Sequence, residues 1–139
     1  MEVSTKDIFS KVTIMEKVNI TIVMVKFFIG QFKYGYRNGK GKSKLSDGSI
    51  YEGQYVNGSL EGRGKFISSD GEVYVGNFKN GLRHGKGMCT YPEGEVYEGK
   101  WLNGKRNGKG KLTNSEGEIF EGIWVNDHIV NFVNSTISA

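Results

Sequence analysis

The stretch GEVYEGKW, residues 94–101, has three close counterparts elsewhere in the chain. They are GSIYEGQY from Gly48, GEVYVGNF from Gly71 and GEIFEGIW from Gly117, so successive copies start 23 residues apart. A weaker fifth copy, FIGQF, occupies residues 28–32. A fixed period of this length is typical of proteins that stack small identical units. The repeat units are 28–50, 51–73, 74–96 and 97–119, with a truncated fifth unit from Phe120.

All 21 glycines keep this register, at repeat positions 3, 8, 12, 14 and 21. Gly94, Gly99 and Lys100 have the spacing of a phosphate-binding loop, but Trp101 stands where that loop requires Ser or Thr. The glycine pair recurs in every unit, whereas the lysine does not. The repeat therefore explains these glycines better than a nucleotide site does.

Each unit has the pattern of a β-hairpin. Aromatic residues at positions 1 and 5 flank a glycine at position 3, which places all three on one face of a strand. Asn-Gly at positions 7 and 8 and an acidic residue with Gly at positions 20 and 21 indicate tight turns. We expect strands near 51–56, 63–68, 74–79, 86–91, 97–102 and 109–113.

One hairpin cannot bury its apolar face alone, so neighbouring hairpins must lie side by side. The predicted fold is all-β, an elongated single-layer antiparallel sheet over about 28–126 that curls into an open trough. In the first unit, Tyr34 replaces the turn asparagine and Ser43 is polar at position 16, which predicts an irregular edge.

The flanking segments match no repeat. Residues 1–27 are expected to form an irregular N-terminal cap or leader, apart from a capping strand at 18–29. The apolar run within it is about 12 residues long, too short for the ~20 residues of a membrane span. At the other end, Asp127 is a candidate N-cap, and Ile129, Phe132 and Val133 have helical spacing. A short helix within 127–139 is therefore predicted to cap the array.

The composition argues against several classes of protein. With 139 residues the chain forms one domain, and its net charge of +4 is too dispersed for nucleic-acid binding. Cys89 is the single cysteine, which favours a reducing, cytoplasmic compartment. His84 and His128 have no metal-binding spacing, and a Cys89–His84 dyad would lack a third, orienting group. We expect no enzymatic activity, no cofactor and no metal.

Several units, among them YEGQYVNGSLEGRGKF and YEGKWLNGKRNGKGKL, closely resemble the MORN repeat. Its pattern is Tyr-Glu-Gly-x-Trp, then Asn-Gly, Gly-Lys-Gly and an acidic-Gly turn. The resemblance covers about residues 28–126 and implies a non-catalytic scaffold at membranes, the cytoskeleton or cilia. It also leaves open an accessory module like those of lipid kinases and SET-type lysine methyltransferases, without their catalytic domain.

Two surfaces are candidates for binding. The first is an aromatic-lined groove for an extended or helical segment of a protein partner; simple ring packing is the alternative. Its residues would be Tyr51, Tyr55, Tyr74, Phe78, Tyr97, Trp101, Phe120 and Trp124.

The second is a basic file for anionic phospholipid, with a plain solvated face as the alternative. Its residues would be Lys40, Arg63, Lys86 and Lys109, with Arg37, Arg83, Arg106, Lys42, Lys65 and Lys111 nearby. We favour the protein-binding scaffold, because +4 is a weak charge for holding a membrane. The sequence also leaves open a homodimer.

Overall fold

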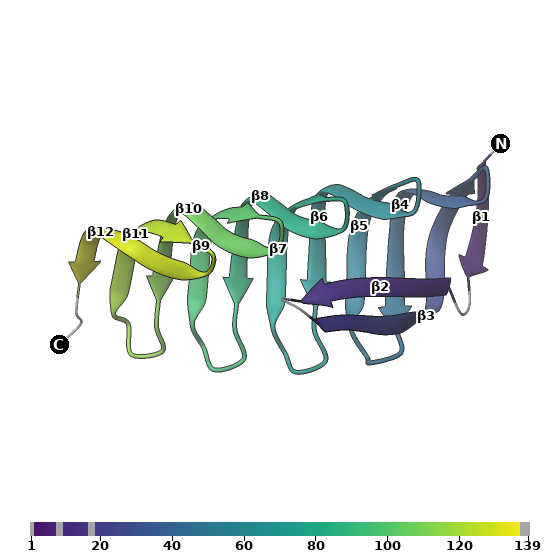
Figure 1. Ribbon diagram of the computed structural model, residues 1–139. Helices are drawn as coiled ribbons and strands as arrows, with labels where there is room; N and C mark the ends of the chain where they lie inside the picture. The colour runs from purple at the N-terminus through teal and green to yellow at the C-terminus, as the bar shows by residue number, and fades with distance from the viewer. Residues whose placement is uncertain (1, 8–9, 17–18, 137–139) are drawn as a thin grey trace.

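The computed structural model describes residues 2–7, 10–16 and 19–136, which form one extended antiparallel sheet (Figure 1). Its strands are β1 (Glu2–Asp7), β2 (Ser10–Glu16), β3 (Asn19–Lys33), β4 (Tyr36–Leu45), β5 (Ile50–Val56), β6 (Ser59–Ile67), β7 (Val73–Lys79), β8 (Leu82–Thr90), β9 (Val96–Leu102), β10 (Lys105–Thr113), β11 (Ile119–Val125) and β12 (His128–Thr136). From β3 to β12 each strand pairs with the next, while β1 and β2 both pair with β3. The described residues include no helix that is long and apolar enough to cross a membrane.

Two-residue turns join the strands within each unit. Asn57 and Gly58 have φ values of 48° and 90°, and Val56 pairs with Ser59 across them. Positive φ at both central residues is the type I′ geometry, whose twist matches that of the flanking strands. The sequence therefore identified these turns correctly.

The second strand of each unit begins earlier than predicted. We expected strands from residues 63, 86 and 109, but β6, β8 and β10 start four residues sooner. The reason is the glycine at repeat position 12, which is Gly62 in β6 with a φ of 74°. There the pairing shifts between Gly53 and Tyr55, so this glycine lies in a bulge inside the strand rather than in a loop.

The two positions of the first unit that depart from the pattern are regular, contrary to the prediction, although the pairing of β3 with β4 shifts between Val25 and Phe27. Tyr34 takes a φ of 51° beside Gly35 at 82°, which reproduces the Asn-Gly turn. Ser43 is buried, and its hydroxyl lies 2.7 Å from the Tyr55 hydroxyl in a hydrogen bond. Polarity at this position is thus accommodated by a hydrogen bond.

The predicted C-terminal helix is wrong, because β12 pairs with β11 instead. Asn126 and Asp127, with φ values of 48° and 72°, form another hairpin turn, so Asp127 is not a helix N-cap. Ile129 pairs with Trp124 and Phe132 with Gly122, with shifts in register between them. A bulged strand thus places these apolar residues in the sheet, which is why their spacing resembled that of a helix.

The N-terminal segment is more regular than expected. Its described residues form β1, β2 and the first half of β3 in place of an irregular leader. The capping strand predicted at 18–29 corresponds to β3, which continues to Lys33. Residue 18 of the predicted strand lies outside the described residues.

The hairpin ends bend across the array, as the upper part of Figure 1 shows. Each turn hydrogen-bonds to the preceding unit: the Gly81 N–H donates to the Leu60 carbonyl at 3.0 Å, and the Gly104 N–H to the Arg83 carbonyl at 2.8 Å. The bend gives a single sheet a sheltered face, and the hydrophobic core lies there.

Candidate functional site

The two faces of the sheet carry different side chains. Because side chains alternate along a strand, repeat positions 1, 3 and 5 lie on one face, which we term the aromatic face. Positions 2, 4, 13, 15 and 17 lie on the other, which we term the open face. The registers bear this out, since Tyr74 pairs with Cys89 and Val75 with Met88.

The rings of the aromatic face pack against one another, mostly edge to face. Tyr74 lies 5.1 Å from Phe78 and 5.2 Å from Trp101, between ring centroids. Tyr97 lies 5.2 Å from both Trp101 and Trp124. Phe28, Tyr74 and Tyr97, all at position 1, thus each contact the position 5 ring of their own unit and of the next, which links the repeats together.

These rings are packed together, which was the alternative to an open groove. Tyr74 and Tyr97 are 0% exposed, and Phe78, Trp101 and Trp124 are 4% exposed. Tyr55 is also buried, while Tyr51 and Phe120 are half-buried. All the predicted groove residues except Phe120 therefore belong to the core or pack against it. Whether a partner contacts them is a separate prediction.

Glycine is required beneath the rings. A Cβ at Gly87 would overlap the Tyr74 ring, and one at Gly110 would overlap the Tyr97 ring. The ring hydroxyls donate to the carbonyls of Asn77 at 2.8 Å and Lys100 at 2.9 Å. Burial raises the pKa of Tyr74 and of Tyr97 to about 12, so both hydroxyls remain donors at neutral pH.

Three arginines lie against these rings, which the repeat pattern did not predict. The Arg37 guanidinium lies 5.7 Å from the Phe28 ring centroid. The Arg83 guanidinium lies 4.9 Å from the Tyr74 ring centroid and 5.2 Å from that of Trp101, and it forms an ion pair with Glu72. Arg106 lies 4.8 Å from the Trp124 centroid, and its Nε lies 3.5 Å from Asp127 Oδ1.

The prediction that these arginines lie near the basic file is wrong. Arg37 pairs directly with Phe32, Arg83 with Phe78 and Arg106 with Trp101, so all three side chains lie on the aromatic face. The cross-strand partner of position 5 was the signal that could have found them. In the second unit Leu60 replaces the arginine, and there Tyr51 packs on Phe66 at 4.5 Å.

Cys89 and His84 have structural roles. Cys89 is fully buried and accepts a hydrogen bond from Arg83 Nη1 at 3.6 Å; burial raises the pKa of its thiol to about 11. His84 Nδ1 accepts from the Asn103 N–H at 3.4 Å, a link between units that Asn107 also makes to Asn126. Among the described residues, no three His, Cys, Asp or Glu side chains group as metal ligands would.

The open face carries a line of exposed cations, which includes all four residues of the predicted basic file. Lys40 pairs with Gln54, Arg63 with Asn77, Lys86 with Lys100 and Lys109 with Ile123. Lys100 therefore adds a fifth cation, and no acidic residue lies opposite any of them. The basic row is defined as Lys40, Arg63, Lys86, Lys100 and Lys109. No acidic side chain in the described part of the chain forms an ion pair with this row.

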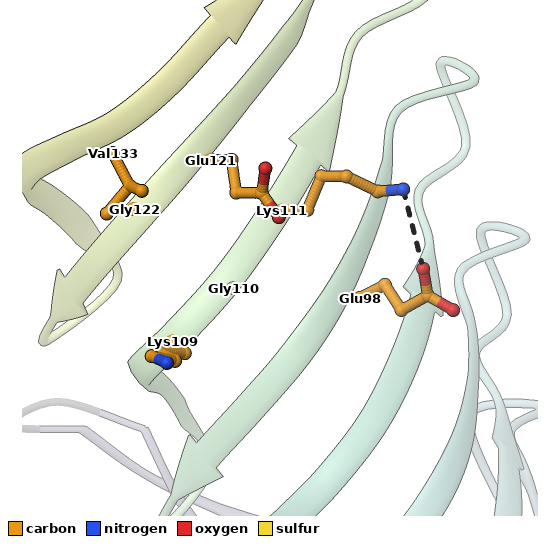
Figure 2. A pocket seen from close by; sticks show the side chains of 7 residues that line it. All are labelled: Glu98, Lys109, Gly110, Lys111, Glu121, Gly122 and Val133. Carbon is orange, nitrogen blue, oxygen red and sulfur yellow. Dashed lines mark ion pairs between the residues drawn. The ribbon is translucent and has the colours of Figure 1, made fainter.

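A second line of charges, two residues along each strand, neutralises itself. Lys42 and Lys65 both pair with Glu52, and Lys111 pairs with both Glu98 and Glu121. Lys111 Nζ lies 3.9 Å from Glu98 Oε1 (Figure 2). We term this line the mixed row; in the third unit it holds Val75 and Met88 instead of charges. The positive charge of the open face is thus concentrated in the basic row.

Two depressions lie between these rows. The smaller, of 370 Å³, is bordered by Glu98, Lys109, Lys111, Glu121 and Val133 and by two glycines (Figure 2). The larger measures 560 Å³, and its lining is Arg63, Val75, Lys86, Gly87, Met88, Glu98, Gly99, Lys100 and Lys109. Both are lined by charged and aliphatic side chains, and neither by an aromatic ring. These depressions are therefore not the aromatic-lined groove that was predicted.

The sequence was compared with known families and curated proteins. The sequence model of the MORN repeat matches residues 28–50, 51–73, 74–96 and 97–118. Each match begins at the aromatic residue of repeat position 1, and together they cover well over half of the chain. No curated protein matches the sequence.

Proposed function

Because the chain belongs to the MORN-repeat proteins, a family of repeat scaffolds, we propose that it is a non-catalytic scaffold that binds a protein partner on the open face. The observation that carries this proposal is the basic row, five exposed cations that form no ion pair with a described acidic residue and lie beside two depressions. A cytoplasmic location, at membranes or at cytoskeletal or ciliary structures, is part of the same proposal.

The open face suits a partner better than the aromatic face does. A partner that reached Tyr74 or Trp101 would have to separate rings that already contact one another at 5.2 Å. The open face requires no such rearrangement, since Met88 is 42% exposed and the cations beside it are exposed. Unpaired surface charge also accelerates and orients the approach of an oppositely charged partner.

A photo-crosslinking residue at Met88 tests the surface. Leu102 supplies the matched control, because it is 47% exposed and lies beside a hairpin turn, away from both depressions. We expect a discrete protein adduct from position 88 in cell extract, absent from position 102 and abolished by Lys86→Glu with Lys109→Glu. Equal adducts from both positions, or adducts indifferent to charge reversal, would refute the proposal.

Attachment to anionic phospholipid through the basic row is the second candidate. Each basic residue near an anionic membrane contributes about 1 kcal/mol, but this attraction is screened within ~8 Å at physiological ionic strength. Sedimentation with phosphoinositide vesicles over a salt series tests it, using wild type and a variant with Gln at 40, 63, 86 and 109. Under the scaffold proposal binding is weak and vanishes at physiological salt. Tight binding that the quadruple variant loses would establish the lipid role instead.

An accessory module of a larger enzyme is compatible with the same surface. In that case the partner would be a catalytic subunit or domain, and the Met88 adduct would identify it. The same crosslinking experiment therefore tests both a free-standing scaffold and an accessory module of an enzyme.

A further inference from the structure

A third row on the open face is aliphatic. One residue pair beyond the mixed row, Ile50 pairs with Ile67, Ile67 with Val73, and Val96 with Thr113. The aliphatic row consists of Ile50, Ile67, Val73, Val96 and Ile119, which are all half-buried, with the exposed Thr90 and the half-buried Thr113 between them. The open face is therefore amphipathic across its width, basic at one side and aliphatic at the other.

The width of this pattern matches an α-helix. The basic and aliphatic rows lie four residues apart along a strand, which is about 13 Å at ~3.3 Å per residue. An α-helix with its side chains is about 10–12 Å across, so one helix can contact both rows at once. A single extended chain is too narrow to do so.

The spacing of the cations along the sheet also matches the repeat of an α-helix. Strands lie about 4.8 Å apart, so Arg63, Lys86 and Lys109, on every second strand, recur at about 9.6 Å. Two turns of helix, or seven residues, rise about 10.5 Å. The difference of about 1 Å per repeat lies within the reach of a lysine side chain. Because sheet twist rotates successive strands by about 20°, a straight helix stays in contact over a few strands only.

We propose that the open face binds an acidic amphipathic helix of about 14 residues, laid across β6 to β10. Acidic residues at seven-residue intervals contact the basic row, and apolar residues enter the depression at Val75 and Met88 and reach the aliphatic row. This inference rests on the proposed scaffold function and specifies the chemistry of its partner.

The mixed row argues against a polyanion. Glu98 borders both depressions, and Glu121 borders the smaller one. A nucleic-acid backbone or a phospholipid layer would bring dense negative charge against these carboxylates and would leave the aliphatic row unmatched. Discrete carboxylates on one side of a helix avoid both penalties.

Three synthetic peptides test the proposal. The first is an amphipathic helix with Glu at seven-residue intervals on one side and Leu on the other. The second has the same composition in scrambled order, and the third carries Lys in place of Glu. Fluorescence anisotropy gives the affinities, and circular dichroism reports helix formation on binding. We expect the first peptide to bind at least tenfold more tightly than the other two and to gain helix when bound.

Variants locate the contact. Lys86→Glu with Lys109→Glu, and separately Met88→Lys, are expected to weaken the first peptide about tenfold or more. Lys79→Glu is the control, because Lys79 is exposed but lies next to a hairpin turn. Thermal melting confirms that each variant is folded. Equal affinity for the scrambled peptide, or binding that ignores both the charge reversals and Met88→Lys, would overturn the proposal.

The scaffold function and the identity of its partner can be refuted separately. If Met88 crosslinks to a partner that contains no acidic amphipathic helix, the scaffold function stands and the helix is wrong. If anionic vesicles bind more tightly than the peptide and Met88→Lys leaves that binding unchanged, the occupant is a membrane. If position 88 gives no adduct and no peptide binds, both proposals are wrong.

Discussion

The aromatic face and the open face come from the same strands, yet they differ in how far the repeats agree. Position 1 is aromatic in every unit, whereas position 2 is Ile29, Glu52, Val75, Glu98 and Glu121 in turn. On the aromatic face each unit must pack against the next, so the residues there recur. The open face carries no such requirement and differs from unit to unit. The repeat therefore encodes the fold on one face and leaves the other free to encode binding.

Among the substitutions that test this contrast, Trp101→Ala is expected to cause the largest loss of stability. Trp101 is 4% exposed, contacts two tyrosine rings and donates from Nε1 to the Gly87 carbonyl at 3.2 Å. Removal of such a side chain costs about 3–5 kcal/mol in the free energy of unfolding. Urea denaturation measures this loss. Leu102→Ala, one residue along and 47% exposed, should change stability by less than about 0.5 kcal/mol. Similar losses at the two positions would contradict the assignment of the faces.

A smaller loss is expected from Gly87→Ala. The added methyl group would overlap the Tyr74 ring, and overpacking of a core costs about 1–3 kcal/mol. In a Tyr74→Leu background the overlap is absent, so the same substitution should cost much less. A double-mutant cycle by urea denaturation gives this coupling. An unchanged cost in the Leu background would mean that the glycine is required for a reason other than the ring.

The sequence predicted the features that recur in every unit and missed those that depend on how the units fold together. The turns, the ring positions and the all-β class followed from Asn57, Gly58 and the aromatic register, because each depends on local chemistry repeated in every unit. The burial of the rings did not, because it depends on hairpin ends that bend back over the preceding unit, as the Gly104-to-Arg83 bond shows. The prediction of a C-terminal helix was wrong because bulges allow Ile129 and Phe132 to pair within a strand despite their helix-like spacing.

The open face was only partly predictable for a related reason. Lys86 and Lys109 were identified from their repeat position, but Lys100 occurs at its position once and gave no periodic signal. Only the register, which sets Lys100 opposite Lys86, adds it to the basic row. Residues that break the repeat thus need the structure before they can be assigned to a surface.

A pair of arginines gives a matched comparison of the faces. Arg83 lies against the rings of Tyr74 and Trp101 with a side chain that is 17% exposed, whereas Arg63 is exposed on the open face. Arg83→Met keeps most of the volume but loses the cation–ring attraction, worth about 0.5–2 kcal/mol. It also leaves the Glu72 carboxylate without its partner. Arg63→Met should change stability by less than about 0.5 kcal/mol. Equal effects in urea denaturation would show that ring stacking contributes nothing to the core.

The smallest expected change in stability is a gain, and it comes from Lys86→Glu. Lys86 and Lys100 lie directly opposite each other, and like charges in that arrangement destabilise a strand pair. Lys86→Glu replaces the repulsion with attraction and should raise the free energy of unfolding by about 0.2–1 kcal/mol, more at low salt than at high salt. Lys79→Glu, which has no cation opposite it because its register partner is Leu82, is the control and should show no gain. Lys86→Glu should at the same time weaken binding of the acidic helix. A residue whose replacement stabilises the fold while it weakens binding is retained for binding, so a loss of stability in Lys86→Glu would remove this argument for the basic row.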